Sequence, residues 1–149
     1  MPTHERPFLD ANVLVYAIYA DASQHEASHF LIEQILTGDR RAFLSPQVLS
    51  EVYAVITDKR KVTKPQSPEE ASSIMETLVN CPSITILPLS QDVSRRLAKL
   101  VRIHDIRSAD VFDAQIVATM MEHGLQTICT YNVKDFTKYP SIRVMSPGE

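Results

Sequence analysis

Short apolar runs alternate along this chain with longer segments in which apolar residues recur at helical spacing. Continuous apolar runs of this length are typical of parallel strands covered on both faces, whereas half-exposed strands alternate apolar and polar residues. The sequence therefore predicts an α/β fold with a mostly parallel central sheet and helices on both of its faces. The expected strands are residues 7–10, 41–45, 84–89, 127–130 and 142–145. The expected helices are residues 13–20, 23–36, 67–80, 90–103 and 109–123, with one more helix that begins at Pro46 and ends in the basic segment 59–64.

Length and composition favour one domain that spans residues 1–149. A chain of 149 residues, of which 44% are hydrophobic, buries a sizeable core without a metal or a disulfide. The two cysteines, Cys81 and Cys129, fit neither a disulfide framework nor a zinc site with paired cysteines, so we expect a reducing, cytoplasmic location. Residues 1–7 are too polar for a signal peptide, and the longest apolar run, residues 13–20, is too short to span a membrane, so we expect no membrane partner.

Polar residues follow three of the expected strands. Asp10 and Ser45 stand at the ends of the first and second expected strands, and Tyr131 and Asn132 lie just beyond the end of the fourth. Ligand sites in parallel α/β sheets lie at the carboxyl ends of the strands, so we expect these side chains near one site. A role for Asp10 as the N-cap of the next helix is as ordinary an interpretation as a role in a functional site.

The helix expected from residue 109 carries an acid in an unusual place. At helical spacing, Gln115, Thr119 and Glu122 define its expected solvent face, and Asp113 projects nearly opposite them, among apolar residues. An ionised carboxylate buried without a partner is costly, so a metal or a catalytic cleft is the better explanation for Asp113. Asp110 either shares that site or is the acid that the first turn of a helix favours.

Two further acids complete the set. Glu51 lies near the edge of the apolar stripe of its helix, and Asp135 lies in a polar turn before Phe136. Mg²⁺ prefers carboxylate and water oxygens, so four acids at strand ends and helix starts suit such a cation. The chemistry that follows is hydrolysis of a phosphodiester bond by a metal-activated water. The formal net charge of −3 excludes only a protein that coats nucleic acid by positive charge alone.

The segments that carry these residues resemble, in their order and spacing, the motifs of PIN-domain ribonucleases, and the chain length resembles that of VapC-type toxins. The segments are residues 8–12, 44–51, 110–118 and 130–136. The resemblance implies a three-layer α/β/α fold, dependence on Mg²⁺ or Mn²⁺, and inhibition of translation by endonucleolytic cleavage of structured RNA such as transfer or ribosomal RNA. It also implies a homodimer, and a VapB-type antitoxin whose C-terminal segment lies across the acidic groove.

Matched to the motifs of that family, Asp10, Glu51 and Asp113 correspond to its three core acids, and Asn12 corresponds to a polar residue that hydrogen-bonds within the site. The chain departs from the pattern at Asn132, where many relatives carry an aspartate. An amide is neutral and binds a cation more weakly, so either Asp135 replaces the missing acid or the last metal contact runs through water. The resemblance therefore implies a catalytic and metal-binding set of Asp10, Glu51, Asp113 and Asp135, supported by Asn12, Ser45, Asp110, Thr130 and Asn132.

Two basic clusters allow two interpretations. The clusters are Arg40 with Arg41, and Lys59 with Arg60 and Lys61. Such runs are usually solvated surface, and the functional interpretation is that they contact RNA phosphates.

Two other function classes remain as alternatives. His25, Glu26 and His29 match the H-E-x-x-H pattern of zinc proteases. However, Ile32 and Ile35 stand where the extended pattern requires glycine and histidine, so we favour exposed residues near the start of an amphipathic helix. The remaining class is a catalytically silent domain that binds RNA or protein through the same groove.

Overall fold

A computed structural model describes residues 5–149 of the protein, so the expectation of a polar segment at residues 1–7 falls largely outside the described part. Within that part every expected strand and helix is present close to its expected position. In chain order the elements are β1 (Phe8–Leu9), α1 (Ala11–Ile18), α2 (His25–Leu36), β2 (Ala42–Leu44), α3 (Pro46–Ile56), α4 (Pro68–Asn80), β3 (Ile84–Ile86), α5 (Gln91–Ile103), α6 (Asp110–Glu122), β4 (Thr127–Cys129), the short 3₁₀ helix η1 (Val133–Asp135) and β5 (Arg143–Met145).

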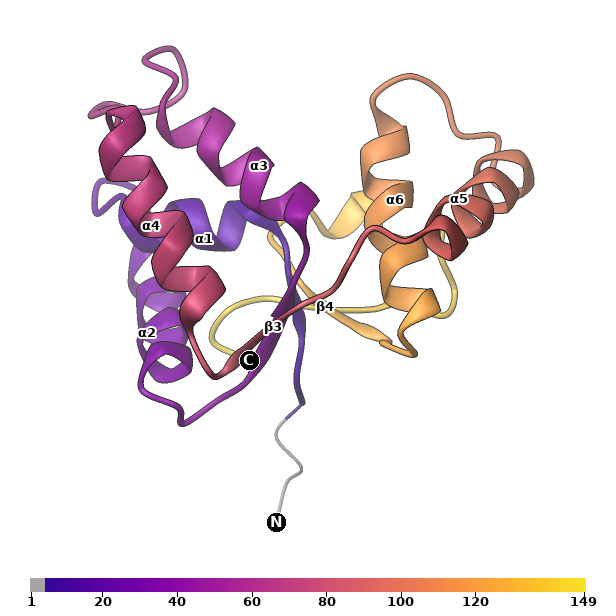
Figure 1. The fold of residues 1–149 in the computed structure, drawn as a ribbon, viewed down its shortest axis with the longest axis horizontal. Coiled ribbons are helices and arrows are strands. Elements are labelled where there is room, and N and C mark those ends of the chain that lie inside the picture. Colours follow the sequence, from indigo (N-terminus) through magenta and orange to yellow (C-terminus); the bar gives the residue numbers. More distant parts are fainter. Residues whose placement is uncertain (1–4) are drawn as a thin grey trace.

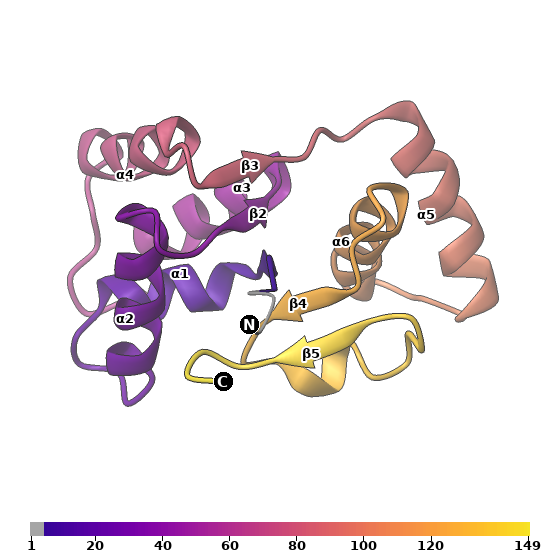
Figure 2. The ribbon, with the colours of Figure 1, turned by 90° about the horizontal axis from the view of Figure 1, so that it is seen from below.

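The strands form one sheet in the order β3-β2-β1-β4-β5, and every described pair is parallel. The chain moves outward from β1 to β2 and β3, and then crosses back to β4 on the other side of β1. Because crossovers between parallel strands are right-handed, this reversal places α1 to α4 on one face and α5 with α6 on the other. Figures 1 and 2 show these two groups of helices on opposite sides of the sheet. The predicted three-layer α/β/α fold is confirmed.

The reversal of strand order between β1 and β4 positions the candidate site. Parallel α/β sheets bind ligands outside the carboxyl ends of the strands at such a switch point. Asp10 directly follows β1 and Thr130 directly follows β4, and the backbone N–H of Asp10 donates to the Cys129 carbonyl at 3.0 Å. The two strand ends therefore lie side by side.

Side-chain caps set where the helices begin. The Asp10 carboxylate accepts the N–H of Ala11, so α1 starts two residues before the expected position. The Ser45 hydroxyl caps α3 by accepting the N–H of Val48 at 3.4 Å. Ser67 caps α4 in the predicted capping box. Its hydroxyl accepts the N–H of Glu70, and its own N–H donates to the Glu70 carboxylate.

The predicted solvent face of α6 is wrong. Thr119 is fully buried, and its hydroxyl donates to the Gln115 carbonyl at 2.9 Å. Glu122 accepts a 2.7 Å hydrogen bond from Nε of Arg96 on α5. Figures 1 and 2 show α5 on the outer side of α6, away from the sheet. Of this predicted face, Glu122 therefore contacts a second helix and Thr119 is buried, because α6 is packed between the sheet and α5.

The centre of the sheet lies in the core. Phe8, Leu9, Ile128 and Cys129, on the adjacent strands β1 and β4, are fully buried. This buried, closely packed pair of neighbouring strands holds the residues that follow both strands in a fixed relation. Among residues 5–149, no helix is both long enough and apolar enough to cross a membrane.

Candidate active site

Asp10 is the buried centre of the candidate site, with 5% of its surface exposed. Its Oδ1 accepts the N–H of Ala11 at 2.9 Å, and its Oδ2 accepts the Thr130 hydroxyl at 2.8 Å and the Asn12 side-chain amide at 3.3 Å. The helix cap and a role in the site are thus compatible, since one carboxylate oxygen binds the helix while the other faces the neighbouring strand end.

Thr130 and Asn12 lock the two strand ends together. The Thr130 hydroxyl donates to Asp10 and accepts from both the Asn12 side-chain amide (3.1 Å) and the backbone N–H of Asn132 (3.0 Å). Asn12 also accepts the N–H of Tyr131 at 3.1 Å through its Oδ1. A hydroxyl has one proton and two lone pairs, so the hydrogen-bonding capacity of Thr130 is fully used. The orientation of the Asp10 carboxylate is consequently fixed.

Glu51 reaches the same region from α3 and is half-buried. Its Oε1 accepts a 2.9 Å hydrogen bond from Nε2 of Gln47, one turn earlier on the helix. The same nitrogen donates to the Phe112 carbonyl at 2.8 Å, and Gln47 Oε1 accepts from Gln115 Nε2 at 2.7 Å. Gln47 was not among the predicted site residues, although its position four residues before Glu51 places both on one helix face.

Asp113, in the first turn of α6, is partly buried and lies among other acids. Burial, followed by the charges of Asp135, Asp10, Glu51 and Asp110, raises the pKa of Asp113 to about 7. The cluster therefore concentrates negative charge that a cation would neutralise. The prediction of a buried Asp113 overestimates its burial, because this residue is only partly buried in the first turn of α6.

The pKa values of Asp10 and Glu51 are also raised. For Asp10, burial outweighs the hydrogen bonds from Thr130 and Ala11 that lower the pKa. For Glu51, burial outweighs the hydrogen bond from Gln47, and the charge of Asp10 raises the pKa further. These mutual effects place Asp10, Glu51, Asp113 and Asp135 in one electrostatic cluster.

The remaining predicted site residues lie around this cluster. Asp135 is exposed on η1, and its charge raises the pKa of both Asp10 and Asp113. Asn132 is exposed beside Thr130, and Asp110 is exposed at the start of α6. The Ser45 hydroxyl is fully buried and caps α3, so its role is in the helix rather than in contact with a ligand.

The oxygen donors suit Mg²⁺ or Mn²⁺ better than zinc. Within residues 5–149, no three His, Cys, Asp or Glu side chains are grouped closely enough to hold one ion together. Zinc sites need three or four protein ligands, whereas Mg²⁺ is usually bound by one or two carboxylates, with waters and substrate phosphate completing its shell. The acid cluster therefore fits Mg²⁺ chemistry.

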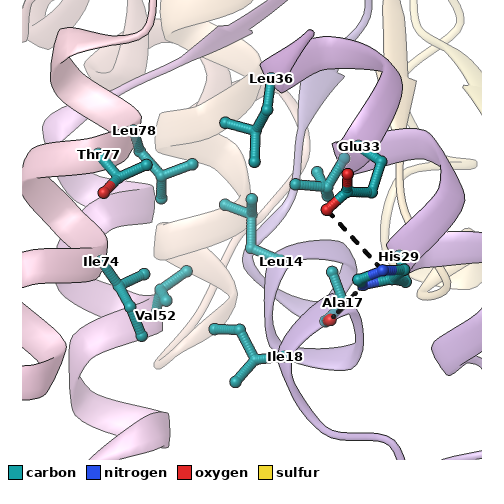
Figure 3. Close-up of a pocket in the computed structure, with 11 residues that line it drawn as sticks. Leu14, Ala17, Ile18, His29, Glu33, Leu36, Val52, Ile74, Thr77 and Leu78 are labelled. Atoms are coloured by element: carbon teal, nitrogen blue, oxygen red, sulfur yellow. Dashed lines mark hydrogen bonds and ion pairs between the residues drawn. The ribbon is translucent and has the colours of Figure 1, made fainter.

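The structure does not favour the zinc-protease interpretation of His25 and His29. Nδ1 of His25 donates to the Tyr16 carbonyl at 2.8 Å, and Nδ1 of His29 lies 3.4 Å from the Ala17 carbonyl. Figure 3 shows His29 between that carbonyl and Glu33, which lies 3.8 Å from its Nε2, on the wall of an apolar pocket between α1, α2, α3 and α4. These contacts attach α2 to α1, which is a structural role.

The two basic clusters lie away from the acids along the chain path. Arg40 and Arg41 precede β2, and so lie at the end of that strand opposite Ser45. Lys59, Arg60 and Lys61 are exposed beyond the last turn of α3. The guanidinium of Arg60 is held by both carboxylate oxygens of Asp58, at 3.1 and 3.2 Å.

Comparison with known proteins gives a consistent result. A family model described as a PIN domain matches residues 8–141. Ribonuclease VapC24 of Mycobacterium tuberculosis is 28% identical over 140 residues, which cover 93% of this chain and 94% of the relative. VapC ribonuclease Mb2897 of Mycobacterium bovis is 30% identical over 116 residues, which cover 78% of this chain and 79% of the relative.

Solved structures share the fold. VapC20 of Mycobacterium tuberculosis, described as a sarcin-ricin loop cleaving toxin, superposes with a TM-score of 0.61 at 16% identity, over 81% of this chain and 85% of that one. VapBC2 of Rickettsia felis, bound to a DNA fragment from its promoter, superposes with a TM-score of 0.64 at 19% identity, over 95% of this chain and 98% of that one. At these identities the likeness concerns the fold alone.

Proposed function

Because this chain belongs to the PIN-domain family, we propose that it is a VapC-type endoribonuclease that depends on Mg²⁺ or Mn²⁺, built as one domain over residues 1–149. The observation that carries the proposal is the acid cluster at the switch point of the sheet, in which neighbouring charges and burial raise the pKa of Asp113 to about 7. A cluster of oxygen donors with unbalanced negative charge is what a hard cation neutralises.

In this proposal Asp10, Glu51, Asp113 and Asp135 bind the metal, one or two of them directly and the others through water, since no three of these side chains among the described residues are grouped around one point. When bound, the metal would lower the pKa of a water and neutralise charge on the scissile phosphate. Thr130 and Asn12 keep the Asp10 carboxylate oriented, so little reorganisation is required when a cation and substrate bind. Asp135, rather than the neutral Asn132, is our choice for the fourth acid, because its charge raises the pKa of both Asp10 and Asp113.

The test is cleavage of total bacterial RNA by the purified protein with Mg²⁺, Mn²⁺ or EDTA. We expect discrete fragments that need metal and disappear in Asp10→Asn and Asp113→Asn variants. Asp39→Asn, which changes an exposed acid in the turn after α2, is the matched control and should cleave normally. Activity that survives in both site variants would contradict the proposal, and RNA binding without cleavage would favour the catalytically silent module.

We propose structured RNA, such as transfer or ribosomal RNA, as the substrate class. One relative of the same fold is described as cleaving the sarcin-ricin loop, which is a structured target. The exposed Lys59 and Lys61 would contact phosphates at a distance from the acids. Each phosphate contact adds about −0.9 to the slope of log affinity against log salt on duplex nucleic acid, so a Lys59→Ala, Lys61→Ala variant should bind RNA with a shallower slope.

We also propose a VapB-type antitoxin as the inhibitory partner. VapBC2 of Rickettsia felis was solved as a complex of this kind, as was a toxin-antitoxin complex from Klebsiella pneumoniae. A basic segment of such a partner would neutralise the acid cluster and displace the metal. Co-expression with the partner should abolish RNA cleavage, and inhibition that persists when the basic residues of that segment are replaced would contradict this mode.

A homodimer completes the proposed assembly. An open hollow of about 350 Å³ beside Glu51 is lined by Pro46, Leu89 and Phe112, and 55% of the Phe112 surface is exposed. Exposed apolar surface of this kind is typical of an interaction site. Light scattering should give twice the chain mass, and a Phe112→Ser variant should shift it toward the monomer.

A further inference from the structure

Gln47 is a buried polar side chain at the beginning of α3, with 8% of its surface exposed. Its side-chain nitrogen donates to Glu51 Oε1 at 2.9 Å and to the Phe112 carbonyl at 2.8 Å, and its side-chain oxygen accepts from Gln115 at 2.7 Å. Both amide hydrogens and one oxygen lone pair are thus in use. Such a group is costly to bury unless its hydrogen bonds are made, and both donors of Gln47 are satisfied here.

The neighbours of Gln47 allow only one orientation of its amide. A carboxylate and a backbone carbonyl accept hydrogen bonds and donate none, so the nitrogen of Gln47 must face Glu51 and Phe112. The amide of Gln115 donates to the opposite side and holds the Gln47 oxygen there. In the flipped orientation, oxygen would face two acceptors, and both hydrogen bonds would be lost.

This arrangement links two acids that come from separate helices. Glu51 lies on α3, while Phe112 directly precedes Asp113 in the first turn of α6. We propose that Gln47, oriented by Gln115, is a positioning residue that fixes the Glu51 carboxylate relative to Asp113 at the metal-binding cluster. The inference rests on the proposed function, because positioning matters only if these acids act together on a cation.

The hydrogen bond also leaves Glu51 able to bind a ligand. Among the residues that the structure describes, Glu51 accepts a side-chain hydrogen bond only at Oε1, from Gln47. Oε2 can therefore face a cation while Oε1 is held. Residues that hold metal ligands in place through hydrogen bonds contribute roughly 10- to 100-fold to metal affinity or activity, although they do not touch the metal.

The test compares the variants Gln47→Ala, Gln47→Met and Gln115→Ala with the wild-type chain. Mn²⁺ affinity without RNA is measured by calorimetry, and kcat and KM are measured for RNA cleavage. Both Gln47 variants should weaken Mn²⁺ binding roughly tenfold or more and lower kcat with KM nearly unchanged. Gln115→Ala should have a smaller effect of the same kind, because it releases the Gln47 amide without removing it. Gln34→Ala, the same change on α2, is the matched control and should behave as wild type.

Thermal melts separate positioning from a purely structural role. Gln47→Met keeps the length of the side chain and loses both donors, so it provides a folded variant if Gln47→Ala melts too low to measure. If the variants melt earlier but bind Mn²⁺ and turn over RNA as the wild type does, Gln47 is structural and the inference is wrong while the proposed function stands. If the wild type itself neither binds Mn²⁺ nor cleaves RNA, the proposed function fails, and the inference fails with it.

Discussion

The hydroxyl of Thr130 donates a 2.8 Å hydrogen bond to Oδ2 of Asp10, a residue 120 positions away in the sequence. The bond lies between the ends of β1 and β4, where the order of the strands reverses. It lowers the pKa of Asp10 against the larger effect of burial. The fold thus brings together a carboxylate and the donor that keeps it both oriented and available in its charged form.

Replacing Thr130 with valine should weaken the site without changing the fold. The variant keeps the shape of the side chain and removes the donor, so the pKa of Asp10 should rise further and Mn²⁺ binding should weaken by about tenfold. The lost buried hydrogen bond should cost roughly 1–3 kcal/mol of folding stability. Thr85→Val, at an exposed position on β3, is the matched control for calorimetry and thermal melts. Unchanged Mn²⁺ affinity in Thr130→Val would contradict the role given to this bond.

Asp113→Asn should stabilise the metal-free protein above neutral pH. The pKa of Asp113 is raised from its ordinary 3.8 to about 7, so between these values the folded state holds a proton that the unfolded state has released. Folding stability therefore falls as the pH rises from about 4 to about 7, and stays lower above that range. Asparagine has no titratable carboxyl group, so the variant avoids this loss of folding stability.

Melting curves recorded in chelator test whether Asp113→Asn stabilises the metal-free protein at high pH. At about pH 8 we expect Asp113→Asn to melt about 2–4 °C above the wild type, which corresponds to about 1 kcal/mol in a chain of this size. At about pH 4 the two should melt together. A variant that melts below the wild type at the higher pH would show that the carboxylates do not repel one another.

The variant His25→Ala, His29→Ala should retain RNA cleavage and its Mn²⁺ dependence. Both rings bind backbone carbonyls of α1, so their loss should lower the melting temperature slightly without touching the acid cluster. Elemental analysis of the purified wild type should find no stoichiometric zinc. One tightly bound zinc per chain, lost in the variant, would revive the protease interpretation.

Gly124 ends α6 with φ at +70°, a conformation that costs a side chain energy even where there is room for it. No atom lies within 4 Å of a Cβ added there, so the cost of Gly124→Ala is purely conformational. We expect roughly 1 kcal/mol of lost stability, and less for Gly124→Asn, because asparagine tolerates this region better. Equal denaturant midpoints for glycine, asparagine and alanine would refute this explanation.

Local signals in the sequence predicted most of the fold. The capping box at Ser67 and Glu70 and the helix stop at Gly124 act over a few residues, and each is present. The acids at strand ends followed from a general property of parallel sheets, in which the carboxyl ends of the strands share one edge. For that reason Asp10 and Asn132 could be predicted near one site from strand ends, whereas Thr130 came only from the resemblance to PIN-domain motifs.

These local signals could not predict contacts between residues that are far apart in the sequence. The hydrogen bonds from Gln47 to Phe112 and from Gln115 to Gln47 join residues 65 and 68 positions apart. The solvent face assigned to α6 failed for the same reason, because Thr119 is fully buried and the partly exposed Glu122 binds Arg96 of α5. Periodicity identifies which residues share a direction, whereas what lies in that direction depends on the tertiary fold.

The most direct test of the central claim is a calorimetric titration of Mn²⁺ into the RNA-free protein, repeated with Asp10→Asn, Asp113→Asn and the control Asp39→Asn. We expect the wild type and the control to bind with the same affinity. In both site variants binding should be lost or weakened at least tenfold, since each removes a carboxylate from the cluster. Wild-type affinity in both variants would show that the acids at the ends of β1 and α6 do not hold the metal, and would contradict the account.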